Sequence, residues 1–140
     1  MTYLRHGLII LFITAIFFSC KKDSFITSSQ ANLSTSADTL SFDTVFTSVG
    51  SVTQSFKIFN DNNQKLQLST VKISGGDSSS FKINVDGISA NEVNNIEINA
   101  NDSIYVFVQV NVNPNNNRLP FIIQDSILIS YNGNQIPLLS

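Results

Sequence analysis

The sequence predicts an all-β fold from about residue 40 onward, organised as an antiparallel sandwich or barrel of about seven to nine strands. Apolar and polar residues alternate over short stretches, as strands with one buried face require. Turn clusters rich in Asn, Asp and Gly separate these stretches at intervals of roughly ten residues, which is typical of sandwiches and barrels. The helical apolar period is missing from this region.

The chain starts with the features of a bacterial lipoprotein signal peptide. Arg5 and His6 supply a positive start, residues 8–18 are apolar except for one Thr, and the small Ser19 precedes Cys20, the only cysteine. This order predicts cleavage after residues 1–19 and lipid on Cys20. More than one hydrocarbon chain on that residue would give stable membrane attachment.

Two alternatives to lipidation were weighed from the same residues. An uncleaved membrane helix is disfavoured because the apolar run is roughly half of the ~20 residues that span a bilayer. Secretion without lipid stays open, because Phe17 stands where Leu is common three positions before the cysteine.

Residues 20–39 are predicted to be the lipidated cysteine and a flexible tether. Small and polar residues dominate this segment, and its few apolar residues show no period. The nineteen residues after Cys20 could reach about 60 Å when extended, at ~3.3 Å per residue. A disordered segment without a spacing role is the alternative.

The first strands of the domain are expected on both sides of a turn at residues 60–63. Phe56 and Ile58 alternate with polar residues before the turn, and Leu66 and Leu68 follow it. This arrangement predicts a hairpin.

A bend and a second hairpin are expected next. The apolar phase shifts at Val71 and Ile73, which indicates a bulge or bend near residues 69–70, and Gly75-Gly76 ends the strand. Residues 81–85 then alternate up to Asp86-Gly87, a dipeptide that tolerates the positive φ angles of a tight turn.

The clearest strand covers residues 104–112, after a short strand at Ile96 and Ile98. Its core face is made by alternating aliphatic residues, namely Ile104, Val106, Val108, Val110 and Val112. Tyr105 and Phe107 enrich the opposite face. This pattern predicts a central strand with one face in the core and part of the other face covered.

The last strands are predicted at residues 121–123, 127–131 and 135–139. A loop at 113–117 precedes them, and Asn132-Gly133-Asn134 gives a hairpin signal between the last two. Because Pro137 cannot donate in a ladder, the final strand is expected to be short, at an edge, or truncated.

Composition excludes several kinds of chemistry. Cleavage before Cys20 removes His6, the only histidine, so the mature chain cannot build a Ser-His-Asp or Cys-His arrangement or a His and Cys zinc site. Removing Arg5 leaves seven basic residues of eight against ten acidic ones, a net charge of −3. The basic residues of the domain are scattered singly, at Lys57, Lys65, Lys72, Lys82 and Arg118, so we expect no nucleic-acid partner. No disulfide and no cofactor are expected.

An Asp, hydroxyl residue and aliphatic residue recur as a triplet. The triplets would place O-glycosylation on Thr39, Thr44, Ser103 and Ser126. They look like the acceptor motif for protein O-glycosylation in some Gram-negative bacteria. The alternative, favoured at each position, is that Asp and Ser or Thr form turns that precede strands. Among the four, Thr39 is the best candidate because it borders the tether.

Carboxylates and amides do not form a recognisable site. The Asn-rich and Asp-rich stretches at residues 60–63 and 91–102 lack the ligand register of an EF-hand, which favours solvated turns over calcium binding. Six carboxylates would suffice in number for a glycosidase, but most are expected at turns or exposed positions. We therefore predict no catalytic residue and no metal site.

Four segments together carry a resemblance to a known family. They are residues 40–46, 56–60, 83–87 and 101–106. These segments resemble the amino-terminal domain of certain Gram-negative surface lipoproteins, which is similar to immunoglobulin-like modules of the Hydin and major-sperm-protein type. The resemblance covers residues 40–134 and implies an immunoglobulin-like β-sandwich over residues 40–140. In that family a parallel β-helix usually follows, so the chain is expected to be a fragment or an isolated copy of the module.

The function expected from these features is that of a non-catalytic, lipid-anchored domain of the cell envelope. It would present or space a binding surface, with the outer membrane as the expected location, facing the cell surface. Its partners would be the membrane, through Cys20, and an unidentified protein or polysaccharide. The alternatives are an accessory module of a larger β-helix adhesin or polysaccharide-active enzyme, and a structural protein that pairs through the edge strand at residues 135–139.

Overall fold

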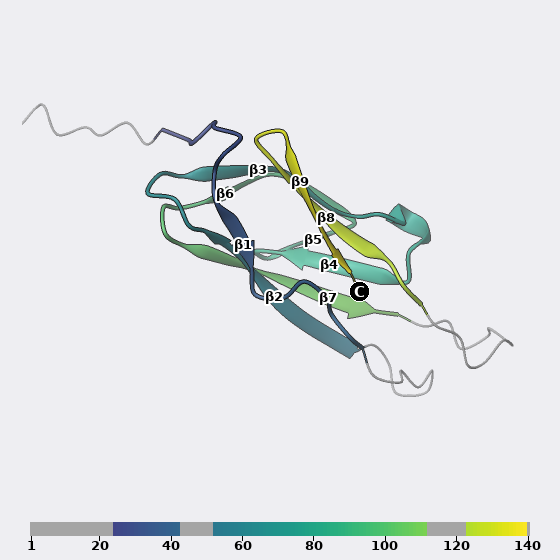
Figure 1. The fold of residues 1–140 in the computed structure, drawn as a ribbon. Helices are drawn as coiled ribbons and strands as arrows, with labels where there is room; N and C mark the ends of the chain where they lie inside the picture. The colour runs from purple at the N-terminus through teal and green to yellow at the C-terminus, as the bar shows by residue number, and fades with distance from the viewer. Residues whose placement is uncertain (1–23, 43–51, 112–122, 140) are drawn as a thin grey trace, which may run out of the picture.

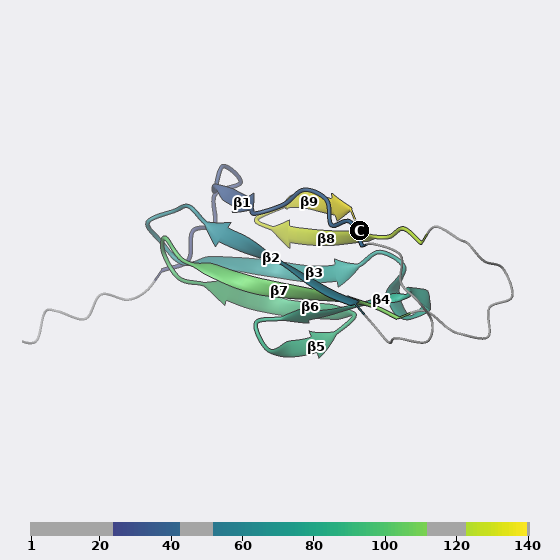
Figure 2. The ribbon, with the colours of Figure 1, turned by 90° about the horizontal axis from the view of Figure 1, so that it is seen from below.

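The computed structural model describes residues 24–42, 52–111 and 123–139 of the 140-residue chain. These residues form nine strands and one short 3-10 helix, arranged as two antiparallel sheets (Figure 1, Figure 2). The all-β antiparallel sandwich predicted from the sequence is therefore confirmed. The predicted signal peptide at residues 1–19, Cys20 and the predicted loop at 113–117 lie outside the described residues.

One sheet has five strands in the order β1-β2-β7-β4-β5, and the other has four in the order β6-β3-β8-β9. The five-stranded sheet contains β1 (Leu33–Thr35), β2 (Val52–Asn60), β4 (Phe81–Val85), β5 (Ile88–Ala90) and β7 (Ser103–Val110). The four-stranded sheet contains β3 (Leu66–Ile73), β6 (Glu92–Ile98), β8 (Ser126–Tyr131) and β9 (Asn134–Leu139). The 3-10 helix η1 (Gly76–Ser78) lies between β3 and β4.

The order of strand pairing is that of an immunoglobulin-like sandwich with two added strands. Such sandwiches pair their strands as A-B-E-D in one sheet and C-F-G in the other. Here β1, β2, β7 and β4 take the A, B, E and D positions, and β3, β8 and β9 take C, F and G. The added strands are β5, beside β4, and β6, beside β3.

The core lies between the two sheets and is built from alternate residues of the longer strands. On β7, the four aliphatic residues predicted to face inward and described by the structure are at most 7% exposed: Ile104, Val106, Val108 and Val110. Phe56 and Phe81 are the largest fully buried side chains. The predicted strand alternation therefore identified the core face correctly.

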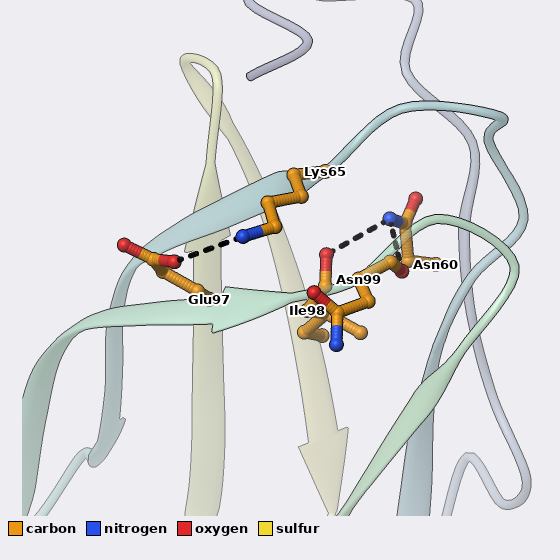
Figure 3. A network of polar contacts seen from close by, with 5 residues as sticks. All are labelled: Asn60, Lys65, Glu97, Ile98 and Asn99. Atoms are coloured by element: carbon orange, nitrogen blue, oxygen red, sulfur yellow. Dashed lines mark hydrogen bonds and ion pairs between the residues drawn. The ribbon is translucent and has the colours of Figure 1, made fainter. Parts of the chain in front are cut away.

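The predicted hairpin around residues 60–63 is wrong. The strand before the turn, β2, pairs with β1 and β7, whereas β3 after the turn pairs with β6 and β8. The turn therefore carries the chain from one sheet to the other. Asn60 holds this crossing, because its buried amide donates to the carbonyl oxygen of Gln64 at 2.8 Å. The same amide donates to the carbonyl oxygens of Ile98 and Asn99 at 3.1 and 2.8 Å (Figure 3).

The bend predicted in the middle of β3 is present and is shared with its neighbour β6. Leu68 pairs with Ile96, and Val71 pairs with Val93 in the same register. Both strands change their buried phase between these pairs, where Asn95 takes a positive φ of 56°. Since the two strands bend together, the ladder needs no extra residue on one side.

The two tight hairpin turns predicted from dipeptides are confirmed. Asp86 and Gly87 join β4 to β5 with φ of 48° and 90°. Asn132 and Gly133 join β8 to β9 with φ of 45° and 80°. Two positive φ angles in a two-residue loop match the right-handed twist of the strands on either side.

The flexible tether predicted for residues 20–39 is wrong for its described part, residues 24–39. β1 pairs with β2 along this segment, and Thr39 forms a parallel bridge with Leu139 (Figure 2). Ala31 and Leu40 are each only 6% exposed. These two residues belong to the hydrophobic core although the segment shows no apolar period. The folded domain therefore begins well before residue 40.

The last strand, β9, lies at a sheet edge as predicted, but part of that edge is already paired. The Leu40 amide donates to the Leu139 carbonyl at 2.8 Å, and the Leu139 amide donates to the Asp38 carbonyl at 3.1 Å. Leu138, on the inner face, is 1% exposed. The N-terminal segment thus pairs with the first sheet through β1 and with the second sheet at residues 38–40.

Candidate binding surface

The outer face of the five-stranded sheet carries an exposed aromatic pair. Tyr105 and Phe107 lie on the central strand β7 and are 47% and 44% exposed. Because side chains alternate along a strand, the burial of Val106 and Val108 turns these two rings outward. The ring centroids are 5.8 Å apart with an interplanar angle of 18°, so the rings are stacked.

A lysine and several neutral polar groups surround the pair. The Lys57 Nζ lies 4.6 Å from the centroid of the Tyr105 ring. On the strands that flank β7, Ser55 and Asn84 are paired with Phe107. The cation over its face and the stacked neighbour both restrict the Tyr105 ring, and a cation-π contact at an exposed site contributes about 0.5–1 kcal/mol.

The five-stranded sheet is positive on a chain that is acidic overall. None of its five strands contains Asp or Glu, and their charged residues are Lys57 and Lys82. The Lys82 Nζ donates to the Asn91 side-chain oxygen at 3.0 Å. In contrast, Glu92 and Glu97 both lie on β6 of the other sheet. The strands of this sheet therefore combine apolar contact area with two lysines, and the exposed Asp86 adjoins Tyr105 by donating its amide to the Tyr105 carbonyl at 3.0 Å.

The Asn-rich turns meet at one end of the sandwich, which we call the asparagine end. It consists of residues 60–65, 99–102 and 132–134, which follow β2, β6 and β8. Hydrogen bonds connect these turns to one another. The Asn60 Oδ1 accepts from the Asn62 Nδ2 at 2.7 Å, and the Asn101 backbone amide donates to the Asn62 backbone carbonyl at 2.9 Å. These amide groups therefore stabilise the turns through hydrogen bonds within the domain.

The same end holds the N-terminal segment. The Asn132 Nδ2 donates to the carbonyl oxygens of Ile26 and Ser28 at 3.0 and 2.9 Å, and the Asn134 Nδ2 donates to the Ser29 carbonyl at 2.6 Å. The Ile26 amide donates to the Lys65 carbonyl at 2.8 Å. Close by, Lys65 and Glu97 form an exposed ion pair at 3.9 Å (Figure 3). An exposed pair of this kind contributes little to stability.

Within the described ranges, no group of three or more His, Cys, Asp and Glu residues could hold a metal ion. Of the carboxylates considered as catalytic candidates, Asp125 already accepts several hydrogen bonds from the protein. It accepts hydrogen bonds from the Ser79 hydroxyl and from the Gly75 and Ser126 amides, the last at 2.7 Å. This residue therefore ties the β3–β4 connection to the start of β8.

The structure describes three of the predicted modification residues, Thr39, Ser103 and Ser126, and they lie on separate segments of the chain. Ser103 and Ser126 are half-buried first residues of β7 and β8, and the Asp before each accepts its backbone amide at 2.7 Å. At both triplets the Asp directly precedes a strand, and O-glycosylation at Ser103 and Ser126 stays a prediction. Thr39 is exposed, whereas Thr44 and the predicted lipidation residue Cys20 lie outside the described residues.

Comparison with protein-family models, with curated proteins and with solved structures finds no match. The resemblance to lipoprotein domains therefore stays a prediction. In the part of the chain that the structure describes, no helix is long and apolar enough to cross a membrane.

The aromatic pair is the feature that sequence reasoning underestimated. Both residues were placed on the second face of their strand, but that face was expected to be partly covered. In the structure the rings remain almost half exposed among the described residues. The sequence contains a signal for this aromatic pair, since two aromatic residues occupy alternate positions of one strand. The neighbouring strands carry polar side chains at the positions that pair with them.

Proposed function

We propose that this chain is a non-catalytic, lipid-anchored domain of the bacterial cell envelope that binds its partner on the outer face of the five-stranded sheet. The observation that carries the binding role is the stacked, exposed pair of Tyr105 and Phe107 at the centre of this face. Aromatic side chains are enriched in protein interfaces, and gathered exposed apolar groups mark interaction sites. The sequence around Cys20 supports the anchor, and the outer membrane, facing the cell surface, is the proposed location.

The charge of the face favours an acidic partner. Lys57 and Lys82 meet no carboxylate on the five strands of this sheet. Complementary charge on a protein or polysaccharide would be steered toward the face and would hold its orientation there. The aromatic pair would then supply the buried contact area.

A paired substitution tests the binding role. Tyr105→Ser with Phe107→Ser should abolish cross-linking of the protein to its envelope partner in living cells, because both apolar anchors are lost. Leu139→Ser is the matched control, since Leu139 is 56% exposed on the other sheet and its change should leave cross-linking intact. Equal cross-linking by the double variant and the wild type, with both folded, would place the binding surface elsewhere.

The two alternative functions, pairing through an edge strand and service as an accessory module, differ in their support. Pairing through the edge strand β9 meets the hydrogen bonds that already occupy Leu139 and the missing amide of Pro137. Leu138→Lys would not test this pairing, because Leu138 is buried and a lysine there would destabilise the domain itself. The accessory-module alternative depends on a longer reading frame and stays a prediction.

A further inference from the structure

We infer that the asparagine end of the sandwich lies against the membrane, so that the strands rise from the bilayer and the η1 end points away from it. This inference rests on the proposed lipidation of Cys20. It adds an orientation, which the lipid alone would not supply. The partner surface is the hydrated headgroup layer of the bilayer.

The first step is the short distance along the chain from the anchor to the fold. Three residues separate Cys20 from Ser24, and the chain is bonded to the domain from Phe25 onward by a parallel bridge to Lys65. Five residue steps span at most about 18 Å at ~3.6 Å each. The lipid is therefore held within this distance of Phe25.

The second step is the length of the domain. Figure 1 shows the purple start of the described chain at one end and the η1 turn at the other. β3 runs from the asparagine end to the η1 end with eight residues. At 3.2–3.4 Å per residue this strand alone spans about 26 Å, which exceeds the reach of the link. The η1 end therefore cannot face the headgroups.

The third step is that the start of the domain does not act as a slack linker. Besides its bonds from Asn132 and Asn134, the segment is held by Asn62, whose side chain donates to the Asn32 carbonyl at 2.7 Å and accepts from the Asn32 amide at 3.0 Å. Release of this segment would leave several carbonyl groups without partners. The lipid is thus coupled to a rigid end.

The chemistry of the asparagine end suits a headgroup layer. Side-chain amides dominate its turns, and both of its acidic side chains already accept hydrogen bonds, Asp61 from the Ser34 hydroxyl at 2.6 Å and Asp102 from the Ser103 amide. Both carboxylates are exposed, and contact with hydrated headgroups would leave their charges in water. Phe25, 36% exposed, adds an apolar group at this end.

The experiment measures the distance of three labelled positions from the bilayer. The lipidated full-length mature protein is reconstituted in phosphatidylethanolamine and phosphatidylcholine vesicles that contain a headgroup spin label. Lipid attachment converts the Cys20 thiol into a thioether, which does not react with a thiol-specific fluorophore. Each variant therefore carries its label on one introduced cysteine. The three variants are Ala100→Cys at the asparagine end, Ser78→Cys at η1, and Ser55→Cys beside the aromatic pair. All three positions are exposed.

We expect the label at position 100 to be quenched several-fold more than the labels at 78 and 55. Equal quenching at 100 and 78 would overturn the orientation. Quenching at 55 as strong as at 100 would also overturn it, because the domain would then lie on its five-stranded sheet. A variant with fifteen Gly and Ser residues inserted between Asp23 and Ser24 should lose the difference between 100 and 78.

The same material separates this inference from the proposed function. An intact mass without lipid, and protein that does not float with the vesicles, would overturn the anchor and the orientation together. A lipid mass with uniform quenching would overturn the orientation alone and leave the anchored domain in place.

Discussion

Asn60 is the only buried polar side chain among the described residues. Its Nδ2 lies within hydrogen-bond distance of three carbonyl oxygens, to which it donates. Its Oδ1 accepts from the backbone and side-chain amides of Asn62. A buried amide is tolerated only when it is hydrogen-bonded, and here both ends of the group are used. One side chain therefore fixes the crossing between sheets that the sequence pattern suggested was a hairpin.

Asn60→Ala should lower the free energy of unfolding by about 2 kcal/mol, because the two N–H groups that its Nδ2 shares among three carbonyl oxygens are lost at roughly 1 kcal/mol each. Urea unfolding at 25 °C, followed by fluorescence of the tyrosines, measures this loss. Asn63→Ala in the exposed part of the same turn is the control and should change stability by less than about 0.5 kcal/mol. A loss for Asn60→Ala as small as that of the control would contradict the role assigned to this amide.

Thr39 is the residue at which O-glycosylation is best placed, since it is exposed whereas Ser103 and Ser126 are half-buried at strand starts. Protein made in its own host should have an intact mass above that of peptide plus lipid, and Thr39→Ala should remove the excess. Ser103→Ala should keep it. A wild-type mass that equals peptide plus lipid would end the hypothesis.

At the scale of the elements, strands and tight turns could be predicted because they depend on local sequence. The alternation in β7 and the Asp86-Gly87 dipeptide each specify their own geometry. Sheet membership could not be predicted from the turn after β2, because residues 60–63 suit a hairpin and a crossing equally well. The difference comes from the carbonyl oxygens of Ile98 and Asn99, which are remote in sequence.

The burial of the N-terminal segment and the exposure of the binding face also depend on contacts between residues that are remote in sequence. Ala31 and Leu40 carry no periodic signal, and only the assembled core shows that they are buried. The aromatic pair was visible in the sequence, but its exposure depends on whether another element covers it. Burial of a strand's second face is a property of the whole fold, which a single strand does not encode.

The N-terminal segment should be protected in hydrogen exchange, because it pairs with both sheets. The amides of Ile26, Ser36 and Leu40 donate to the carbonyl oxygens of Lys65, Lys57 and Leu139 at 2.8, 3.0 and 2.8 Å. Each should exchange at least about tenfold more slowly than in a synthetic peptide of residues 24–42. Exchange at the peptide's rate would restore the tether interpretation for this segment.

At the scale of the whole molecule, the two sheets differ in charge, and the described chain starts at one end of both. The acidic residues of the strands lie on the four-stranded sheet, and the aromatic pair with its lysine lies on the five-stranded one. A domain that stands on the asparagine end would present both faces sideways. A partner would then approach parallel to the membrane.

Cys20→Ala should release the protein from the membrane fraction, because no second hydrocarbon anchor is proposed. Fractionation of the native envelope and intact mass measure this change, and protease added to whole cells reports which side of the outer membrane the domain faces. Cys20→Ala protein that still sediments with membranes would contradict anchoring by lipid alone.

The pairing of residues 38–40 with Leu139 has a consequence for folding kinetics. About a hundred residues separate the two partners of this bridge, so the loop that it closes contains nearly the whole domain. Contacts between such distant segments are slow to form, since the entropy of loop closure is lost before the contact is gained. During synthesis, residues 38–40 have no partner in the second sheet until β9 has been made. Residues 38–40 therefore join that sheet last.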